Sequence, residues 1–306
     1  MQSYLRVKQA WSQLAILFAT MFGGFVLSMI VTLIMALGKG IPLNALAKLD
    51  ANDPAMVDFL KTLQAISSFT IFLFPSILFA LIVYRKKPLE NLGLKATPLP
   101  VYYLLGIALM LFSLPLVAWL GELNQLVPLP KSFDEMEAEA GKQIGAFLKV
   151  NNAKDIIINF LVIAFIPAIC EEALFRGSLQ RVLTRLFRNP WIAIIVTALI
   201  FSAFHLQFRG FFPRAFFGIM LGCLYWYSGS LWVCIVGHFV VNGIQLAAAL
   251  YYPKFASENP EIGAGAIISS GVITGLLLYY IIKKSVTYYH TEFPPESAED
   301  FHGFPR

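Results

Sequence analysis

Long runs of apolar residues, separated by short polar segments, make up most of the chain. A run of about 20 such residues is long enough to cross the hydrocarbon core of a bilayer as a helix. The pattern therefore predicts an all-α fold, a polytopic membrane helix bundle of about eight transmembrane helices. The predicted spans are residues 14–37, 63–84, 101–120, 155–187, 191–206, 216–227, 231–250 and 264–282.

Turn and kink residues lie at positions that fit these spans. Asn189-Pro190 is a turn signal between two of them, so the helices on either side are expected to run antiparallel. Pro75 and Pro115 lie inside predicted spans, where a proline removes a backbone hydrogen bond and bends the helix. We expect one membrane domain over residues 1–284, followed by a polar, disordered tail over 285–306.

Two polar segments carry helical patterns of their own. Apolar residues recur at helical spacing over residues 133–150, which predicts an amphipathic helix that lies on the membrane surface or in a solvated loop. Arg181, Arg185 and Arg188 fall on one face of a predicted helix end, where we expect them to reach toward lipid headgroups.

Composition supports a membrane protein and excludes some functions. The 306 residues are 58% hydrophobic and 13% charged, whereas soluble domains carry about 25% charged residues. The formal charge of +5 is spread over short loops without a basic stripe, so we expect membrane lipid and no nucleic acid as a partner. The three cysteines lie in apolar runs and are read as buried small side chains.

The distribution of lysine and arginine predicts the orientation of the bundle, because basic loops stay on the cytoplasmic side. Eight spans with the N-terminus inside place most basic residues on one side. We therefore expect a multi-pass protein of a bacterial-type cytoplasmic membrane, with both termini cytoplasmic. The basic residues on that side are Arg6, Lys8, Arg85, Lys86, Lys87, Lys95, Arg181, Arg185, Arg188, Lys283 and Lys284.

The first candidate site is Glu171-Glu172 with Arg176, attached to a run of apolar residues. Charges at such positions cost about 2.5–3.5 kcal/mol each on membrane insertion scales, so a chain that keeps three together is expected to use them. Glu172 and Arg176 are four residues apart and can pair on one helix face. Glu171 points about 100° away and is predicted to remain free as a general base.

Two further polar pairs lie in later spans. His205 follows Phe201 by four residues, and the Asn189-Pro190 turn would bring His205 to within about 3 Å of the height of Glu171. His238 and Asn242 are also four apart and share one face, from which they could together stabilise a developing oxyanion.

Other interpretations of these residues remain open. A histidine in a membrane helix more often makes a helix–helix hydrogen bond, and the glutamates with Arg176 could form a structural ion pair. A proton-coupled transporter, or a non-catalytic immunity or scaffold protein, could carry the same groups. The chain contains no HExxH, GxSxG or GxGD motif, so zincin, serine and aspartyl protease assignments lack support.

Taken together, the motifs Glu171-Glu172-x-x-x-Arg176, Phe201-x-x-x-His205 and His238-x-x-x-Asn242 resemble those of the CPBP family. This family of CAAX proteases and bacteriocin-processing proteins, also called Abi, includes the Ras-converting CAAX endopeptidases and the lysostaphin-resistance-like proteins. The resemblance covers roughly residues 150–250 and implies an intramembrane endopeptidase.

By this resemblance, Glu171 and His205 would activate the attacking water, and His238 with Asn242 would hold the oxyanion. Glu172 and Arg176 would orient and brace the first glutamate, with Phe201 in support. The family is usually labelled metalloprotease, so zinc held by Glu171, His205 and His238 is an alternative to a metal-free glutamate mechanism, which the pairing of His238 with Asn242 favours. The expected substrate is a membrane-associated or lipid-modified protein or peptide, prenylated or bacteriocin-like.

Overall fold

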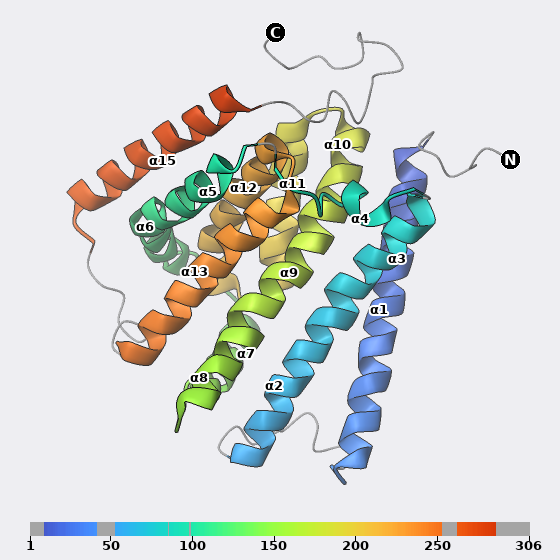
Figure 1. The fold of residues 1–306 in the computed structure, drawn as a ribbon. Helices are drawn as coiled ribbons and strands as arrows, with labels where there is room; N and C mark the ends of the chain where they lie inside the picture. Colours follow the sequence, from blue (N-terminus) through green and yellow to red (C-terminus); the bar gives the residue numbers. More distant parts are fainter. Residues whose placement is uncertain (1–8, 42–52, 85, 98, 253–261, 286–306) are drawn as a thin grey trace, which may run out of the picture.

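The computed structural model describes residues 9–41, 53–84, 86–97, 99–252 and 262–285. These residues form helices and connecting segments, and no strand occurs among them (Figure 1). The all-α helical bundle predicted from the sequence is confirmed. Residues 286–306, for which a disordered tail was predicted, lie outside the described residues.

A helix occupies each predicted apolar segment. The first two segments form α1 (Ala10–Gly38) and a continuous run of α2 (Pro54–Ser68), η2 (Phe69–Leu73) and α3 (Phe74–Val83). The fourth is a single helix of 35 residues, here called the site helix, which runs from Ala153 to Phe187. It consists of α8 (Ala153–Asn159), η3 (Phe160–Phe165), α9 (Ile166–Glu172), η4 (Ala173–Gln180) and α10 (Arg181–Phe187).

The remaining helices follow the predicted order. They are α4 (Pro88–Asn91), α5 (Val101–Phe112), α6 (Leu114–Gln125), α7 (Lys131–Phe147), α11 (Pro190–Phe204), the short η5 (Phe208–Gly210), α12 (Phe211–Ser228), α13 (Leu231–Tyr251) and α15 (Ala264–Lys284).

Length and composition decide which helices could cross a membrane. Within the described ranges five helices qualify, or six if α5 and α6, bent by 42° at one break, form one span. The protein is thus a multi-pass integral membrane protein. α11 has 15 residues and spans about 22 Å, less than the hydrocarbon core, so a crossing by α11 stays a prediction, as does one by α12.

The site helix lies in the middle of the bundle. α1 and α3 pack on one side of it, and α13 packs on the other, followed by α5, α6 and the outermost α15 (Figure 1). Buried apolar side chains form one cluster among α5, α12 and α13, and another among α1, α3, α11 and the site helix. Many large apolar side chains on α1 and α15 are exposed, as expected for faces toward lipid.

Two wide π-helical turns precede prolines inside the long helices. η2 ends just before Pro75, and η3 ends just before Pro167. A proline lacks the N–H that would bond to the preceding turn, and a wide turn accommodates its ring. At the first of them α1 comes very close, because a Cβ on Gly24 would lie 2.3 Å from the Thr70 carbonyl oxygen.

The turn predicted at Asn189-Pro190 is confirmed. Arg188 has a left-handed backbone with φ of 53°, which ends α10. Oδ1 of Asn189 accepts hydrogen bonds from the backbone N–H groups of Trp191 and Ile192, at 2.9 and 3.2 Å, and so caps α11. α11 therefore starts where α10 ends and runs back along the site helix toward its beginning.

The expectation for the arginines was wrong for Arg181. This side chain is buried within the bundle, where its Nη1 donates to the Tyr225 hydroxyl at 3.1 Å. Arg185 donates to Oε1 of Gln13 on α1 at 3.1 Å. These contacts join α10 to neighbouring helices, and a buried guanidinium needs such partners more than a headgroup-facing one does.

Candidate active site

One cavity of about 660 Å³ collects most of the predicted site residues. The site helix contributes Glu171, the end of α11 contributes Phe201 and His205, and α13 contributes His238 and Asn242. The rest of the lining is mostly apolar. Residues far apart in the sequence therefore meet in one polar region of an otherwise apolar cavity.

The two glutamates differ in environment, as helical geometry predicts. Glu172 and Arg176 are both 0% exposed, and Nη1 of Arg176 donates to Oε1 of Glu172 at 2.6 Å. Glu171 is 9% exposed and lines the cavity. Its Oε2 is buried and accepts no hydrogen bond from the described residues. Glu171 therefore keeps an acceptor oxygen beside the cavity.

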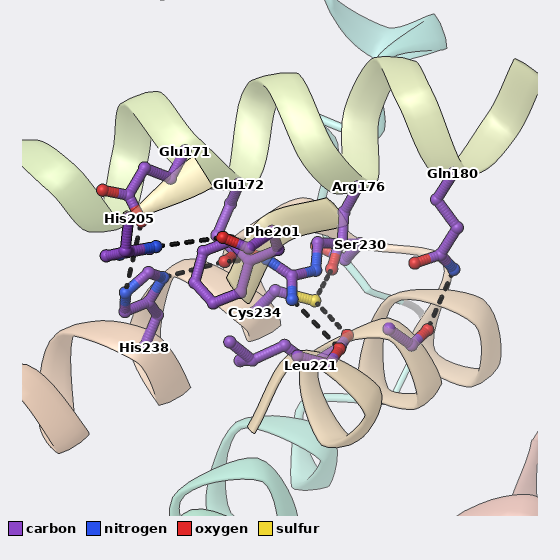
Figure 2. Close-up of polar contacts among 12 residues, drawn as sticks. Glu171, Glu172, Arg176, Gln180, Phe201, His205, Leu221, Ser230, Cys234 and His238 are labelled. Carbon is purple, nitrogen blue, oxygen red and sulfur yellow. Dashed lines mark hydrogen bonds and ion pairs between the residues drawn. The ribbon is translucent and has the colours of Figure 1, made fainter. Parts of the chain in front are cut away.

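His238 lies between the two carboxylates (Figure 2). Its Nδ1 is 2.8 Å from Oε1 of Glu172, and its Nε2 is 3.9 Å from Oε2 of Glu171. Since an ionised carboxylate can only accept, Nδ1 carries a proton and donates to Glu172. This bond fixes the imidazole ring with Nε2 toward Glu171.

The ring of Phe201 lies against Arg176, His205 and His238. The Arg176 guanidinium lies 4.8 Å from the ring centre. The imidazoles of His205 and His238 lie edge-on, with centroids 5.0 and 6.0 Å away. A cation over an aromatic face is favourable, and more so where water is excluded. Phe201 thus contacts groups from three helices (Figure 2).

His205 lies at the end of α11, where the chain turns away. Leu206 has a left-handed backbone with φ of 55°, an uncommon conformation for leucine that ends the helix. Nδ1 of His205 is 2.9 Å from the Phe201 carbonyl oxygen, which can only accept, so this nitrogen carries the proton. In the neutral ring Nε2 is then the acceptor.

Asn242 lies one turn after His238 on α13, and both side chains line the cavity. Nδ2 of Asn242 donates to the Ile163 carbonyl oxygen at 3.5 Å, a long hydrogen bond. The amide therefore retains donor capacity for another group in the cavity.

Just after Glu171 along the chain, two hydrogen bonds join the site helix to α12. Nη2 of Arg176 donates to the Gly218 carbonyl oxygen, and Nε2 of Gln180 donates to that of Gly222, each at 3.0 Å. Both donors and both acceptors are four residues apart. A Cβ on Gly218 would lie 2.8 Å from the Ala198 Cβ, so glycine is needed for α11 and α12 to approach.

The predicted zinc ligands do not form a metal site in this arrangement. Among the residues that the structure describes, no three His, Cys, Asp or Glu side chains are placed to hold a metal ion. Nδ1 of His238 is bonded to Glu172, and Nδ1 of His205 to a carbonyl. Such bonds are usual for metal-ligating histidines and leave each Nε2 free, so the misfit to zinc rests on the placement of the described side chains alone.

The sequence pattern did not identify every residue that lines the cavity. Arg214 and Gln207 lie near its His205 side, and Gln143 with Ile144 of α7 also lines it. Arg214 follows Pro213 near the start of α12, and the sequence pattern assigned it no role. The sequence signal that could have identified Arg214 is the position of a charged residue directly before a long apolar segment.

The amphipathic helix predicted over residues 133–150 is α7, which contacts neighbouring segments at both ends. Arg209 of η5 donates to Oδ1 of Asp134 at 2.7 Å, and the rings of Phe133 and Phe208 make an edge contact with centroids 4.6 Å apart. At the other end, the Phe147 carbonyl oxygen accepts a 2.5 Å hydrogen bond from Asn159. α7 is thus fastened at both ends beside the cavity.

Comparison with known families gives one match. Residues 153–244 match the family model described as Rce1-like, type II CAAX prenyl endopeptidase. No curated protein and no solved structure matches the chain. The matched segment runs from the start of the site helix to just beyond Asn242, and so contains all three motifs. The match of residues 153–244 to this family model agrees with the resemblance in the sequence.

Proposed function

We propose that the protein is an intramembrane endopeptidase that hydrolyses a peptide bond in a membrane-associated or lipid-modified substrate. One observation supports this above the others. Glu171, His205, His238 and Asn242 line the same cavity, and all four lie in the segment that matches the Rce1-like family model. A base, a second proton acceptor and amide or imidazole donors are the groups that peptide hydrolysis requires.

In the proposed mechanism Glu171 takes a proton from water, and the oxygen attacks the scissile carbonyl carbon. Nε2 of His205 accepts the second hydrogen bond from that water and orients it. The developing oxyanion receives hydrogen bonds from Nδ2 of Asn242 and from Nε2–H of His238 in its imidazolium form. The C–N bond then breaks, and the leaving nitrogen takes the proton held by Glu171, which restores the carboxylate.

Glu172 and Arg176 have a positioning role in this scheme. Glu172 accepts a hydrogen bond from Nδ1 of His238 and so fixes the ring with Nε2 toward Glu171. Arg176 neutralises Glu172 and ties it to α12. Catalysis by fixed donors depends on such pre-oriented groups, because they need no rearrangement as charge develops.

The decisive test replaces the base. Full-length protein in phospholipid vesicles is given an S-farnesylated peptide, and cleavage is followed by mass spectrometry. We expect Glu171→Ala and Glu171→Gln to lose at least about 100-fold in rate, the scale of general-base catalysis. Glu139→Ala, on the exposed side of α7, is the matched control and should retain full rate.

Full residual cleavage in Glu171→Ala would contradict the assignment of the base. A protein that cleaves no lipid-modified or bacteriocin-like peptide, and whose Glu171→Ala variant leaves the membrane proteome of its host unchanged, would instead be a non-catalytic immunity or scaffold protein or a transporter. The same proteome comparison would identify substrates.

Metal dependence has its own measurement. Because no three potential ligands among the described residues are placed to hold a metal ion, we expect activity to survive chelation and the purified protein to lack stoichiometric zinc. One tightly bound zinc, whose removal abolishes cleavage and whose return restores it, would overturn the glutamate mechanism.

A further inference from the structure

The guanidinium group of Arg214 has few hydrogen-bond partners among the described residues. It lines the cavity together with His205, near the start of α12. Its Nη1 donates to Oε1 of Gln207 at 3.5 Å, a weak contact. Its Nε and Nη2 are buried and have no hydrogen-bond partner among the described residues. Leaving buried charged donors unpaired is costly, so a site that retains them is expected to bind a ligand there.

The backbone beside Arg214 is shaped to receive this group. Gly210 also lines the cavity, and a Cβ at this position would lie 2.6 Å from Nη1 of Arg214. Any other residue at 210 would therefore displace the guanidinium. Glycine at 210 thus leaves room for the guanidinium beside the backbone.

No carboxylate of the described residues neutralises Arg214 directly. Glu137 on α7 acts on it electrostatically, but the hydrogen bond of Glu137 goes to the backbone N–H of Arg209 at 3.4 Å. The neighbouring Arg209 is different, since it donates to Asp134 at 2.7 Å. One arginine at this end of the cavity is thus paired, and the other is available to a ligand.

We infer that Arg214 is a specificity-determining residue that binds a carboxylate of the peptide substrate. Nε and Nη2 are adjacent N–H donors on one edge of the guanidinium, and this edge matches the two oxygens of a carboxylate. A peptide can offer that group as its C-terminal carboxylate or as an Asp or Glu side chain. The inference rests on the proposed peptidase function in one respect: it assumes that the ligand in the cavity is a peptide.

The test measures binding, so that it does not depend on cleavage. The protein is full-length Glu171→Ala in vesicles, with Arg214 intact. The probes are dansyl-labelled S-farnesyl peptides without other acidic groups, prepared as the free acid, as the C-terminal amide, and as the amide with one internal glutamate. We expect the acid or the glutamate peptide to bind on the order of 10- to 100-fold tighter than the plain amide.

Adding Arg214→Gln should remove this preference and leave binding of the plain amide unchanged. Arg214→Lys should keep part of it, and the control Lys142→Gln, which removes an exposed positive charge from α7, should keep all of it. The comparison of free acid with glutamate peptide identifies which carboxylate is recognised. Equal binding of all three peptides to the protein with Arg214, a preference that survives Arg214→Gln, or no binding at all would overturn the inference.

The proposed catalytic function can fail separately. If Arg214-dependent binding occurs but the unmutated protein never cleaves the bound peptide, the cavity recognises a carboxylate and the peptidase assignment is wrong. If cleavage depends on Glu171 but acid and amide peptides react alike, the peptidase stands and the role of Arg214 is wrong.

Discussion

Oε1 of Glu172 accepts hydrogen bonds from two cationic or potentially cationic groups, Arg176 at 2.6 Å and His238 at 2.8 Å. This single oxygen therefore joins the site helix to α13. Removing one member of such a buried set leaves its partners uncompensated, which costs more than removing both together.

We predict strong non-additivity at this pair. Arg176→Met alone should lower the free energy of unfolding by about 3–5 kcal/mol, and the double variant with Glu172→Gln by clearly less than the sum of the two single changes. Thermal or denaturant unfolding in detergent micelles measures this.

The exposed pair Lys87–Glu90, 2.9 Å apart, is the control, and Glu90→Gln should change stability by less than about 1 kcal/mol. Simple additivity of Glu172→Gln and Arg176→Met would show that the buried residues act independently.

At the scale of elements, the approach of α11, α12 and the site helix depends on glycine. We predict that Gly218→Ala lowers stability by about 1–3 kcal/mol and weakens peptide cleavage, because the new methyl group would meet Ala198 and shift the carbonyl that Arg176 binds. Gly271→Ala on α15, where nothing lies within 4 Å of the added Cβ, should lower neither stability nor cleavage. Loss of cleavage in both variants would point to a general effect of helix substitution instead.

The fastening of α7 gives a second prediction at this scale. Asp134→Asn removes the charged partner of Arg209 and should speed hydrogen–deuterium exchange across residues 131–147. Glu135→Gln, an exposed change one residue away, should not. Equal exchange rates in Asp134→Asn and the unmutated protein would contradict this prediction. The ring contact of Phe133 with Phe208 and the hydrogen bond from Asn159 to Phe147 would then suffice to hold α7 in place.

Helix positions and local pairs could be predicted from the sequence, and contacts between helices could not. The Glu172–Arg176 pair follows from a spacing of four residues, and the Asn189-Pro190 hairpin follows from turn chemistry. The bond from His238 to Glu172 depends on the rotation of α13 about its own axis, which distant packing determines. Arg214 could not be identified as a candidate site residue from the sequence, because only the folded structure shows that it lines the cavity and that two of its N–H groups have no partner among the described residues.

At the scale of the whole molecule, the two ends of the bundle differ. α10 and the start of α11 lie at the end of the bundle where α1 begins, whereas α8 begins at the opposite end (Figure 1). α7 is fastened beside the cavity, to η5 and to α8. If basic loops mark the cytoplasmic face, the cavity opens toward the other face.

We predict this orientation from cysteine labelling. Lys142→Cys on α7 should react with a membrane-impermeant maleimide added to intact cells, and Lys86→Cys should react only after the membrane is opened. The native cysteines are buried, which keeps the background low. The reverse pattern would place the cavity mouth on the cytoplasmic side.

The contact of Glu172 with residues contributed by later helices also bears on how the protein is made. During synthesis the site helix enters the membrane before α12 and α13 exist, so its carboxylates and Arg176 first meet lipid without the Gly218 carbonyl or His238. The nascent helix therefore carries Glu172 and Arg176 before all of their partners exist. On the proposed mechanism, peptide hydrolysis can begin only after residue 242 has been inserted, so an incomplete chain would be inactive.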